Sequence, residues 1–220
     1  MEATRVPRVK ICCIATVEEA RLAVQAGAAA IGLVGPMPSG PGIIADEQIR
    51  VIAAAVPPPV ATFLLTSEVE PAAIIAHHRR TRTNTIQLVD RLAPGVHQAL
   101  RAELPGVKIV QVVHVLDEAS LAEAIAAARH VDALLLDSGD PNLAVKELGG
   151  TGRTHNWGIS ARIRQAVDIP VFLAGGLNPG NVREAIAAVG PFGIDVCSGV
   201  RSDGRLDADK LRRFCAAMPR

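Results

Sequence analysis

Short runs of β-branched and apolar residues alternate with alanine-rich stretches along the whole chain, and this alternation limits the possible folds most strongly. The runs that predict strands are residues 9–13, 30–34, 60–65, 85–88, 108–113, 133–136, 170–173 and 193–197. The stretches that predict helices are residues 17–25, 46–55, 71–78, 95–104, 120–129, 159–167, 179–188 and 207–216. Strands that alternate with helices indicate right-handed crossovers and a parallel sheet. The strands are near-continuous apolar runs, which is typical of strands covered on both faces.

Eight strand–helix units favour a closed barrel over an open sheet. We therefore predict the α/β class and a single-domain (β/α)8 TIM barrel that spans residues 1–220. Helix start signals agree with this prediction. Thr16 precedes a helical stretch with Glu19 three residues on, Asn156 is a candidate cap, and Asn178 precedes Pro179 as a first helical residue.

The composition excludes several classes of function. With 23 basic and 22 acidic residues the net charge is +1, aromatic residues make up 2%, and Tyr is absent, so we predict no nucleic-acid partner and no membrane partner. Its four cysteines show neither a disulfide framework nor metal-ligand spacing, so we predict no metal. No apolar signal segment follows the first ten residues, which favours the cytoplasm. The sequence does not indicate an oligomeric state.

Three glycine-punctuated segments follow the last three predicted strands, and they indicate a phosphate ligand. The residues that we expect to bind it are Gly150, Thr151, Gly152, Gly175, Gly176, Ser198 and Gly199. Glycine lets backbone N–H groups approach an anion closely, and successive N–H groups form anion-binding nests. Each segment alone could be only a turn or a flexible loop. In barrels of this kind the loops after strands converge on one face, and the last two often bind phosphate.

Two strand ends carry candidate acid–base residues. Cys12 lies at the end of the first strand and Asp137 ends the sixth, so both are expected at the same rim. A thiolate is a competent base, and a poorly solvated Asp is a competent acid, which suits proton removal at one atom and delivery to another. Each residue also has a purely structural alternative. Cys12 could be a small buried apolar side chain, and Asp137 could only form hydrogen bonds within its loop. We expect Cys13 to point away from Cys12 and to pack, and His114 is a further residue that could reach the pocket.

The two vicinal histidines at 77 and 78 precede Arg79 and Arg80, and they predict a solvated helix end. The loop at residues 35–42, which is rich in Gly and Pro, is a candidate cover for a substrate.

Together these segments resemble the phosphoribosylanthranilate isomerase family over nearly the whole chain. The resemblance is carried by VKIC at 9–12, LLLDS at 134–138, GGTGRT at 149–154 with Trp157, LAGGLNP at 173–179 with NV at 181–182, and DVCSGV at 195–200. It implies a TIM barrel that performs an Amadori rearrangement without cofactor or metal. It also implies that Asp137 is the general acid, that Cys12 is the general base, and that the glycine loops hold the 5′-phosphate of a small phosphosugar substrate.

The departures from the family pattern cluster at the anthranilate end of the implied site. Pro41 stands where the family has an Arg for the anthranilate carboxylate, Val89 stands in place of a His, and Cys13 in place of a Gly. The family's basic residue in the fifth strand aligns with Gln111. Losing a bidentate Arg–carboxylate contact removes a strong recognition bond.

Three functional readings therefore stay open. The chain is a phosphoribosylanthranilate isomerase of tryptophan biosynthesis with a rebuilt anthranilate pocket, a related isomerase for another phosphorylated sugar or ribosylamine, or a non-catalytic phosphosugar-binding barrel. Cys12 and Asp137 argue against the last, because binding alone needs neither.

Overall fold

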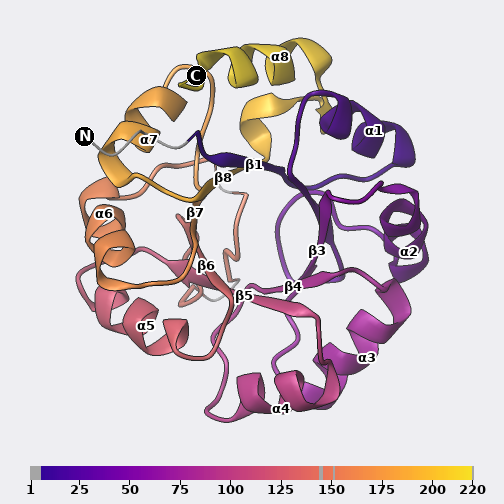
Figure 1. Cartoon of the computed structure of the whole chain (residues 1–220), viewed down its shortest axis with the longest axis vertical. Coiled ribbons are helices and arrows are strands. Elements are labelled where there is room, and N and C mark those ends of the chain that lie inside the picture. The colour runs from indigo at the N-terminus through magenta and orange to yellow at the C-terminus, as the bar shows by residue number, and fades with distance from the viewer. Residues whose placement is uncertain (1–5, 144–145, 151, 220) are drawn as a thin grey trace.

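Eight parallel strands close into a barrel in chain order from β1 to β8, as Figure 1 shows in a computed structural model that describes residues 6–143, 146–150 and 152–219. Their bounds are β1 Arg8–Ile11, β2 Ala30–Val34, β3 Ala61–Thr66, β4 Thr85–Leu88, β5 Lys108–His114, β6 Ala133–Asp137, β7 Val171–Leu173 and β8 Gly193–Val196. β8 pairs with β1 in parallel, from Arg8 opposite Gly193 to Ile11 opposite Val196, and this pairing closes the barrel. The predicted fold class is confirmed.

Helices ring the barrel on the outside and alternate with its strands (Figure 1). Their bounds are α1 Val17–Gln25, α2 Asp46–Ala55, α3 Pro71–Thr81, α4 Val96–Glu103, α5 Ala119–Ala128, α6 Trp157–Ala166, α7 Val182–Val189 and α8 Ala208–Ala217. Two predicted caps are confirmed: Thr16 accepts a hydrogen bond from the Glu19 N–H, and Asn156 accepts one from the Gly158 N–H. These caps satisfy backbone donors that have no partner inside the helix.

The helix predicted to start at Pro179 starts instead at Val182. Asn178 begins a turn, because its side chain accepts a hydrogen bond from the Gly180 N–H at 2.8 Å. The Asn181 side chain in turn accepts one from the Asn178 N–H at 2.8 Å. Such side-chain bonds compete with helical bonding and delay the helix by one turn.

Two apolar layers make up the core. One lies between the strands and the helices and contains residues such as Ile31, Ile52 and Leu64. The other fills the barrel with residues such as Val110 and the Phe63–Phe172 pair, whose ring centroids lie 6.0 Å apart edge to face. Because side chains alternate along a strand, neighbouring residues of one strand serve the two layers.

The prediction of a solvated helix end at the two histidines is wrong. Both side chains are buried, at 2% and 8% exposure. His77 lies 2.9 Å from the Thr66 hydroxyl, and His78 lies 2.7 Å from the Thr83 carbonyl oxygen. A buried polar group needs such partners, so the two rings pack α3 against the barrel while the arginines that follow stay in solvent.

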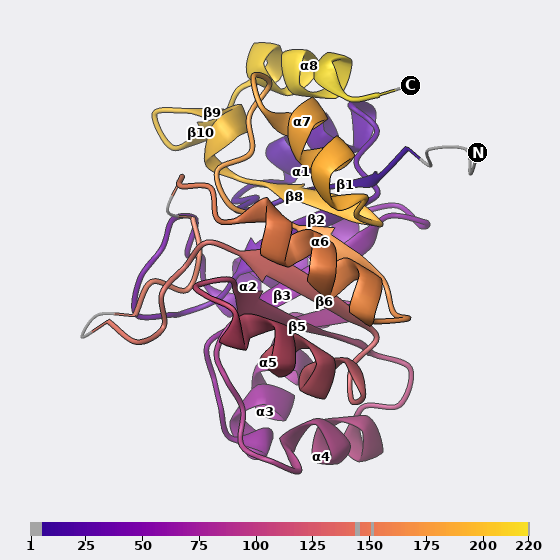
Figure 2. The ribbon, with the colours of Figure 1, turned by 90° about the vertical axis from the view of Figure 1, so that its left-hand side faces the viewer.

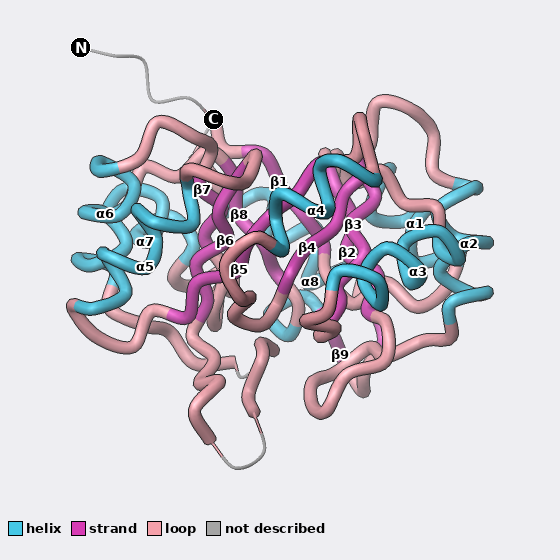
Figure 3. The backbone as a smooth tube through the Cα atoms, turned by 90° about the horizontal axis from the view of Figure 1, so that it is seen from below, coloured by secondary structure: helices cyan, strands magenta, loops and turns pink. Residues whose placement is uncertain are grey.

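The longest loops project from one end of the barrel. Figure 3 shows them at one end of the barrel, and Figure 2 shows the segment between β6 and α6 extending beside the segment after β2. The Ser39 hydroxyl donates a hydrogen bond to the Lys146 carbonyl oxygen, which joins these two loops. The Lys146 ammonium also pairs with the Asp90 carboxylate after β4. None of the described helices combines the length and apolar character that a bilayer crossing requires.

After β8 the chain forms a short 3-10 helix, η1 (Ser198–Val200), and a hairpin of β9 (Arg201–Ser202) and β10 (Arg205–Leu206), which the sequence did not predict. Glu19 at the start of α1 accepts a hydrogen bond from the Leu206 N–H at 2.8 Å and one from the Arg201 guanidinium at 3.2 Å. The hairpin is thereby tied to the end of the barrel where β1 finishes.

Candidate active site

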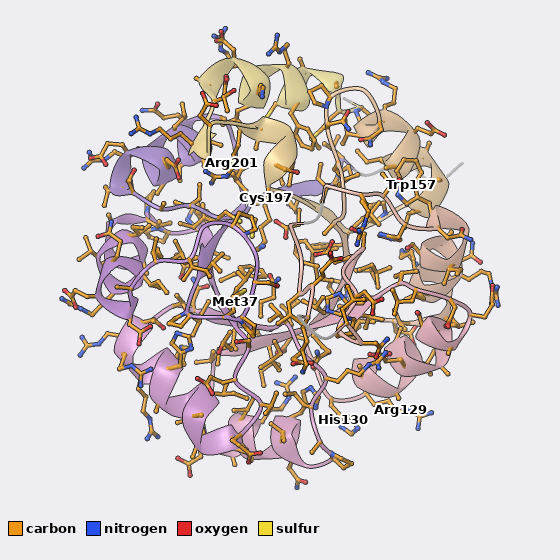
Figure 4. The ribbon with its side chains drawn as sticks, turned by 180° about the vertical axis from the view of Figure 1, so that it is seen from behind. Met37, Arg129, His130, Trp157, Cys197 and Arg201 are labelled. Atoms are coloured by element: carbon orange, nitrogen blue, oxygen red, sulfur yellow. The ribbon has the colours of Figure 1, made fainter. Side chains whose placement is uncertain are left out.

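A pocket that is partly open to solvent lies at the carboxyl ends of the strands. Cys12, just beyond β1, and Asp137, at the end of β6, both line it. This is the face on which (β/α)8 barrels carry their active sites. In Figure 4, Met37 and Cys197 lie over the mouth of the barrel.

Cys12 is 5% exposed, and its side chain occupies space that is free only because residue 32 on β2 is a glycine. A Cβ added to Gly32 on β2 would lie 2.8 Å from the Cys12 sulfur and 3.0 Å from the Lys10 nitrogen. The thiol and the ammonium therefore share one small space inside the barrel. The Arg201 guanidinium donates a hydrogen bond to the Cys12 carbonyl oxygen at 3.0 Å and fixes the backbone at this point.

Lys10 is fully buried and forms an ion pair with Asp195 on β8, with the Lys10 nitrogen 2.8 Å from the Asp195 Oδ2 atom. Its ammonium also lies 5.3 Å from the centre of the Phe63 ring. Burial lowers the pKa of Lys10, but the charges of Asp195 and Cys12 outweigh it and raise the pKa overall. Lys10 therefore stays charged, and it faces the place where a Cys12 thiolate would carry its negative charge.

In this ion pair the charged form of Asp195 is less well stabilised than that of Lys10. Burial raises the pKa of its carboxyl, and Lys10 opposes that shift only in part. The Oδ1 atom is buried with no hydrogen-bond partner among the described residues. Burial of a carboxylate oxygen without a hydrogen-bond partner disfavours the charged form, and this explains why the pKa of Asp195 is raised.

Asp137 is 8% exposed, and burial raises the pKa of its carboxyl above the usual range. The Ser138 N–H donates a 2.7 Å hydrogen bond to Oδ1 and opposes that shift in part, as does the charge of His114. Gly149 closes over the other oxygen, because a Cβ there would lie 2.8 Å from Oδ2. This setting stabilises the protonated form of Asp137 relative to that of a solvated carboxyl, which is the direction that a general acid requires.

His114 pairs in register with Asp137 across β5 and β6. Its Nε2 atom lies 3.0 Å from the Val89 carbonyl oxygen, and the ring is 3% exposed. His114 therefore lies beside the acid and contacts backbone.

The three glycine segments meet as predicted, with backbone packed on backbone. A Cβ on Gly176 would lie 2.6 Å from the Arg153 carbonyl carbon, and one on Gly199 would lie 2.0 Å from the Leu177 carbonyl oxygen. Of the predicted phosphate-binding residues, Gly150, Gly152, Gly175, Gly176 and Ser198 line the pocket. Gly199 lies against the loop after β7, and Thr151 lies outside the described residues.

Apolar side chains form the other half of the pocket. Val34, Met37, Leu65, Val89 and Leu148 line it, and none of the described residues around it is a Lys or an Arg. An aromatic ring suits such a wall, because burial of apolar surface is favourable there.

Three arginines near the middle of the chain do not replace the missing cation, because their side chains face solvent. Arg79 pairs with Glu103 and Arg91 with Glu123, and Arg82 is exposed.

Gln111, in the middle of β5, and Cys13, just after β1, differ from expectation. Gln111 points away from the pocket, because its amide donates to the Leu88 and Asp90 carbonyl oxygens and its Oε1 atom meets His97. It therefore does not supply the group that the family places on the fifth strand. Cys13 does not point away from Cys12, as strand alternation predicted. It follows the end of β1 with φ +62°, a left-handed conformation that breaks strand alternation, and it lines the pocket.

Sequence reasoning missed Lys10, Arg201 and Cys197. Lys10 could have been found, because it lies two residues before Cys12 and strand alternation places both on the same face. Arg201 could not, since its position depends on the hairpin after β8. Among the described residues, no group of three or more His, Cys, Asp or Glu side chains could hold a metal ion.

Comparison with known proteins agrees with this geometry. Residues 9–217 match the profile of the family described as N-(5'phosphoribosyl)anthranilate (PRA) isomerase. Curated relatives named N-(5'-phosphoribosyl)anthranilate isomerase include one from Methanocella arvoryzae, 36% identical over 94% of this chain and 95% of the relative. Another, from Haloferax volcanii, is 40% identical over 96% of this chain and 92% of the relative.

Solved structures give the same picture. The phosphoribosyl anthranilate isomerase of Thermotoga maritima superposes with a TM-score of 0.80 at 31% identity, covering 96% of this chain and 98% of that one. A phosphoribosyl anthranilate isomerase in complex with reduced 1-(o-carboxyphenylamino)-1-deoxyribulose 5-phosphate superposes with a TM-score of 0.77 at 29% identity, covering 96% and 97% of the two chains.

Proposed function

Because the chain belongs to the N-(5'-phosphoribosyl)anthranilate isomerase family, we propose that it catalyses the Amadori rearrangement of N-(5'-phosphoribosyl)anthranilate in tryptophan biosynthesis, as an aldose–ketose isomerase. The observation that carries the proposal is that Cys12, after β1, and Asp137, at the end of β6, line one pocket although β7 and β8 separate their strands. The barrel acts as one domain over residues 1–220, and the reaction takes place in the cytoplasm. Four free cysteines fit that compartment.

Proton transfer by the two side chains accounts for the reaction. Asp137 gives its proton to the furanose ring oxygen, the C1′–O bond breaks, and the ring opens to a Schiff base. Cys12 as thiolate then removes the C2′ proton, which gives an enolamine that tautomerises to the ketose. The raised pKa of Asp137 supports the first step, and the Lys10 ammonium beside Cys12 stabilises the charge of a thiolate in the second.

The glycine segments hold the 5′-phosphate of this phosphosugar substrate. Backbone N–H groups at Gly150, Gly152, Gly175, Gly176, Ser198 and Gly199 are the proposed donors, together with Thr151. Such donors need no reorganisation when the anion arrives.

The anthranilate ring lies against the apolar wall, and its carboxylate faces the open mouth of the pocket. A buried carboxylate without a partner costs about 2–5 kcal/mol, so an uncharged wall favours the orientation in which the carboxylate stays hydrated. A related ribosylamine without that carboxylate would fit the same wall, which is why substrate choice is part of the test.

Turnover of freshly prepared phosphoribosylanthranilate, followed by loss of its fluorescence, tests the proposal. We expect Cys12→Ala and Asp137→Asn each to lower kcat by about 10²–10⁴-fold. Cys215→Ala is the matched control, since that thiol lies on α8 with its sulfur 3.7 Å from the Ala26 carbonyl oxygen.

Absence of turnover at millimolar substrate would contradict the isomerase proposal. If sugar phosphates then raised the Tm, the chain would be a binding barrel instead. Turnover that survives both substitutions would refute the assigned roles while leaving the reaction in place.

A further inference from the structure

Two cysteines at the rim of the pocket come from opposite ends of the chain and meet. The Cys13 sulfur, just after β1, lies 2.8 Å from the Cys197 sulfur, just after β8. The covalent S–S bond is about 2.05 Å long, so less than about 1 Å separates this contact from a bond. Both residues line the pocket, and Cys197 is only partly buried, so it is the sulfur that small solutes can reach.

The backbone at Cys13 explains why its thiol reaches this place. Its φ of +62° lies in the left-handed region, which residues other than glycine seldom adopt. Gly42 in the loop after β2 leaves the room that the side chain needs, because a Cβ there would lie 2.5 Å from the Cys13 Cβ. Residue 13 therefore has a backbone conformation typical of glycine, and its thiol side chain points towards the end of β8.

We propose that Cys13 and Cys197 form a redox-active dithiol, which a small disulfide such as oxidised glutathione converts to a Cys13–Cys197 disulfide that reversibly stops the isomerase. Formation of the bond follows from the geometry alone, whereas its effect on turnover rests on the proposed function.

The charges around the two sulfurs assign their roles. The hydrogen bond with Cys13 lowers the pKa of Cys197, and the charge of Arg201 lowers it further. Figure 4 shows Cys197 and Arg201 on neighbouring parts of the rim. The pKa of Cys13 is raised by its contacts with Cys12 and Cys197 and by burial. Cys197 is therefore the attacking thiolate, because nucleophilic reactivity belongs to the thiolate form.

The exchange balances in two steps. The Cys197 thiolate attacks one sulfur of the small disulfide RSSR, forms a mixed disulfide and releases RS⁻. The Cys13 thiol gives its proton to a base such as RS⁻ and attacks the Cys197 sulfur, which releases a second RS⁻. Overall, two protein thiols and RSSR give one protein disulfide and two RSH, so the protein loses two electrons and the reagent gains them.

The new bond would disturb both ends of the site. Cys13 directly follows Cys12, the proposed base, in the chain, and Cys197 directly precedes Ser198, a proposed phosphate contact. Closing the sulfur separation from 2.8 Å to a bond shifts these backbones by a fraction of 1 Å. Because a misplacement of about 1 Å can cost about 10² in rate, we expect turnover to fall by one to two orders of magnitude.

Thiol counting tests the bond without reference to activity. After incubation with excess oxidised glutathione and removal of the reagent, the number of titratable thiols in denaturant should fall from four to two. A disulfide-linked peptide pair with Cys13 and Cys197 should appear by mass spectrometry. Cys12→Ser should still form this bond, and Cys215→Ser, the matched control, should lose two of its three remaining thiols.

Turnover tests the consequence. Oxidised wild type should lose about 10–100-fold in kcat and recover it with dithiothreitol, whereas Cys197→Ser, which lacks the attacking thiol, should lose no activity on the same treatment. Cys13→Gly, which lacks the resolving thiol, should stop at a glutathione adduct on Cys197 and form no protein disulfide. A Cys12–Cys13 linkage, glutathione adducts without the predicted cross-link, or an unchanged count of four thiols would overturn the dithiol. A cross-link that leaves kcat unchanged in an active enzyme would overturn the switch, and an enzyme inactive even when reduced would count against the proposed function instead.

Discussion

Replacing Lys10 with Met should destabilise the protein far more than the loss of one ion pair at the surface. The Lys10 nitrogen is fully buried 2.8 Å from the Asp195 carboxylate, which is 7% exposed. Removing one partner of a buried pair leaves an uncompensated charge and costs about 3–5 kcal/mol. For a domain of this size each kcal/mol shifts the Tm by about 2–4 °C, so the Tm should fall by about 6–20 °C.

Equilibrium unfolding in urea, with thermal unfolding beside it, measures this loss. Lys108→Met is the matched control, because Lys108 is 66% exposed and pairs with Asp132 at 3.3 Å. An exposed pair contributes about 0–1 kcal/mol. The double variant Lys10→Met with Asp195→Leu should recover most of the stability, since it leaves no unpaired charge at this position. Equal losses at the two lysines, or no recovery in the double variant, would refute the reasoning.

The loss of stability caused by Lys10→Met should also depend on pH. Burial already raises the pKa of Asp195, and loss of the ammonium raises it further. The folded state then holds a proton that the unfolded state has released, so stability falls as pH rises through the folded pKa. The difference from wild type should therefore be larger at pH 8 than at pH 5, and a difference independent of pH would contradict the assignment to Asp195.

Three further outcomes follow from the site. Gly149, at φ +143°, is a position where Ala would place a methyl group 2.8 Å from the Asp137 Oδ2 atom, so kcat of Gly149→Ala should fall about 10²-fold. The control is Gly106→Ala, at φ +90° with no atom near the added methyl group, which should lower stability only. Because burial raises the pKa of Asp137 and the acid must hold its proton, kcat/KM should fall as pH rises past that pKa, and Asp137→Asn should lack this limb. A phosphoribosylamine of aniline, which lacks the carboxylate, should keep kcat/KM within about threefold of the anthranilate substrate, and a loss above about 30-fold, or 2 kcal/mol, would show that a cation holds the carboxylate.

The barrel itself was predictable, because its signal is repeated eight times. Alternating apolar strands and helices leave few topologies, and the convergence of strand ends follows from the topology. Cys12 and Asp137 were placed by that argument, and the glycine segments were found because a close approach of backbone N–H groups to an anion favours residues without a Cβ.

What escaped prediction depends on local geometry at strand ends. Strand alternation fails at Cys13, whose left-handed conformation turns it towards β8, and at Asn178, whose side chain forms a turn where a helix was expected. The buried Lys10–Asp195 pair was missed because its members lie 185 residues apart and meet only when the barrel closes. Arg201 reaches the Cys12 backbone through a hairpin that carries no periodic signal.

The contact between the loops after β2 and β6 bears on how new substrate preferences can arise in this chain. Pro41 lies against Gly150 so closely that a Cβ on the glycine would meet the proline ring at 2.5 Å. The residue that stands in the position of the family's carboxylate-binding Arg thus supports the loop proposed to hold the phosphate. The two ends of the substrate are therefore not independent modules, and a change at position 41 alone would alter phosphate affinity together with aglycone choice. Selection for a new aglycone should proceed through paired changes at positions 41 and 150, and libraries that vary only one of the two loops would miss the successful combinations.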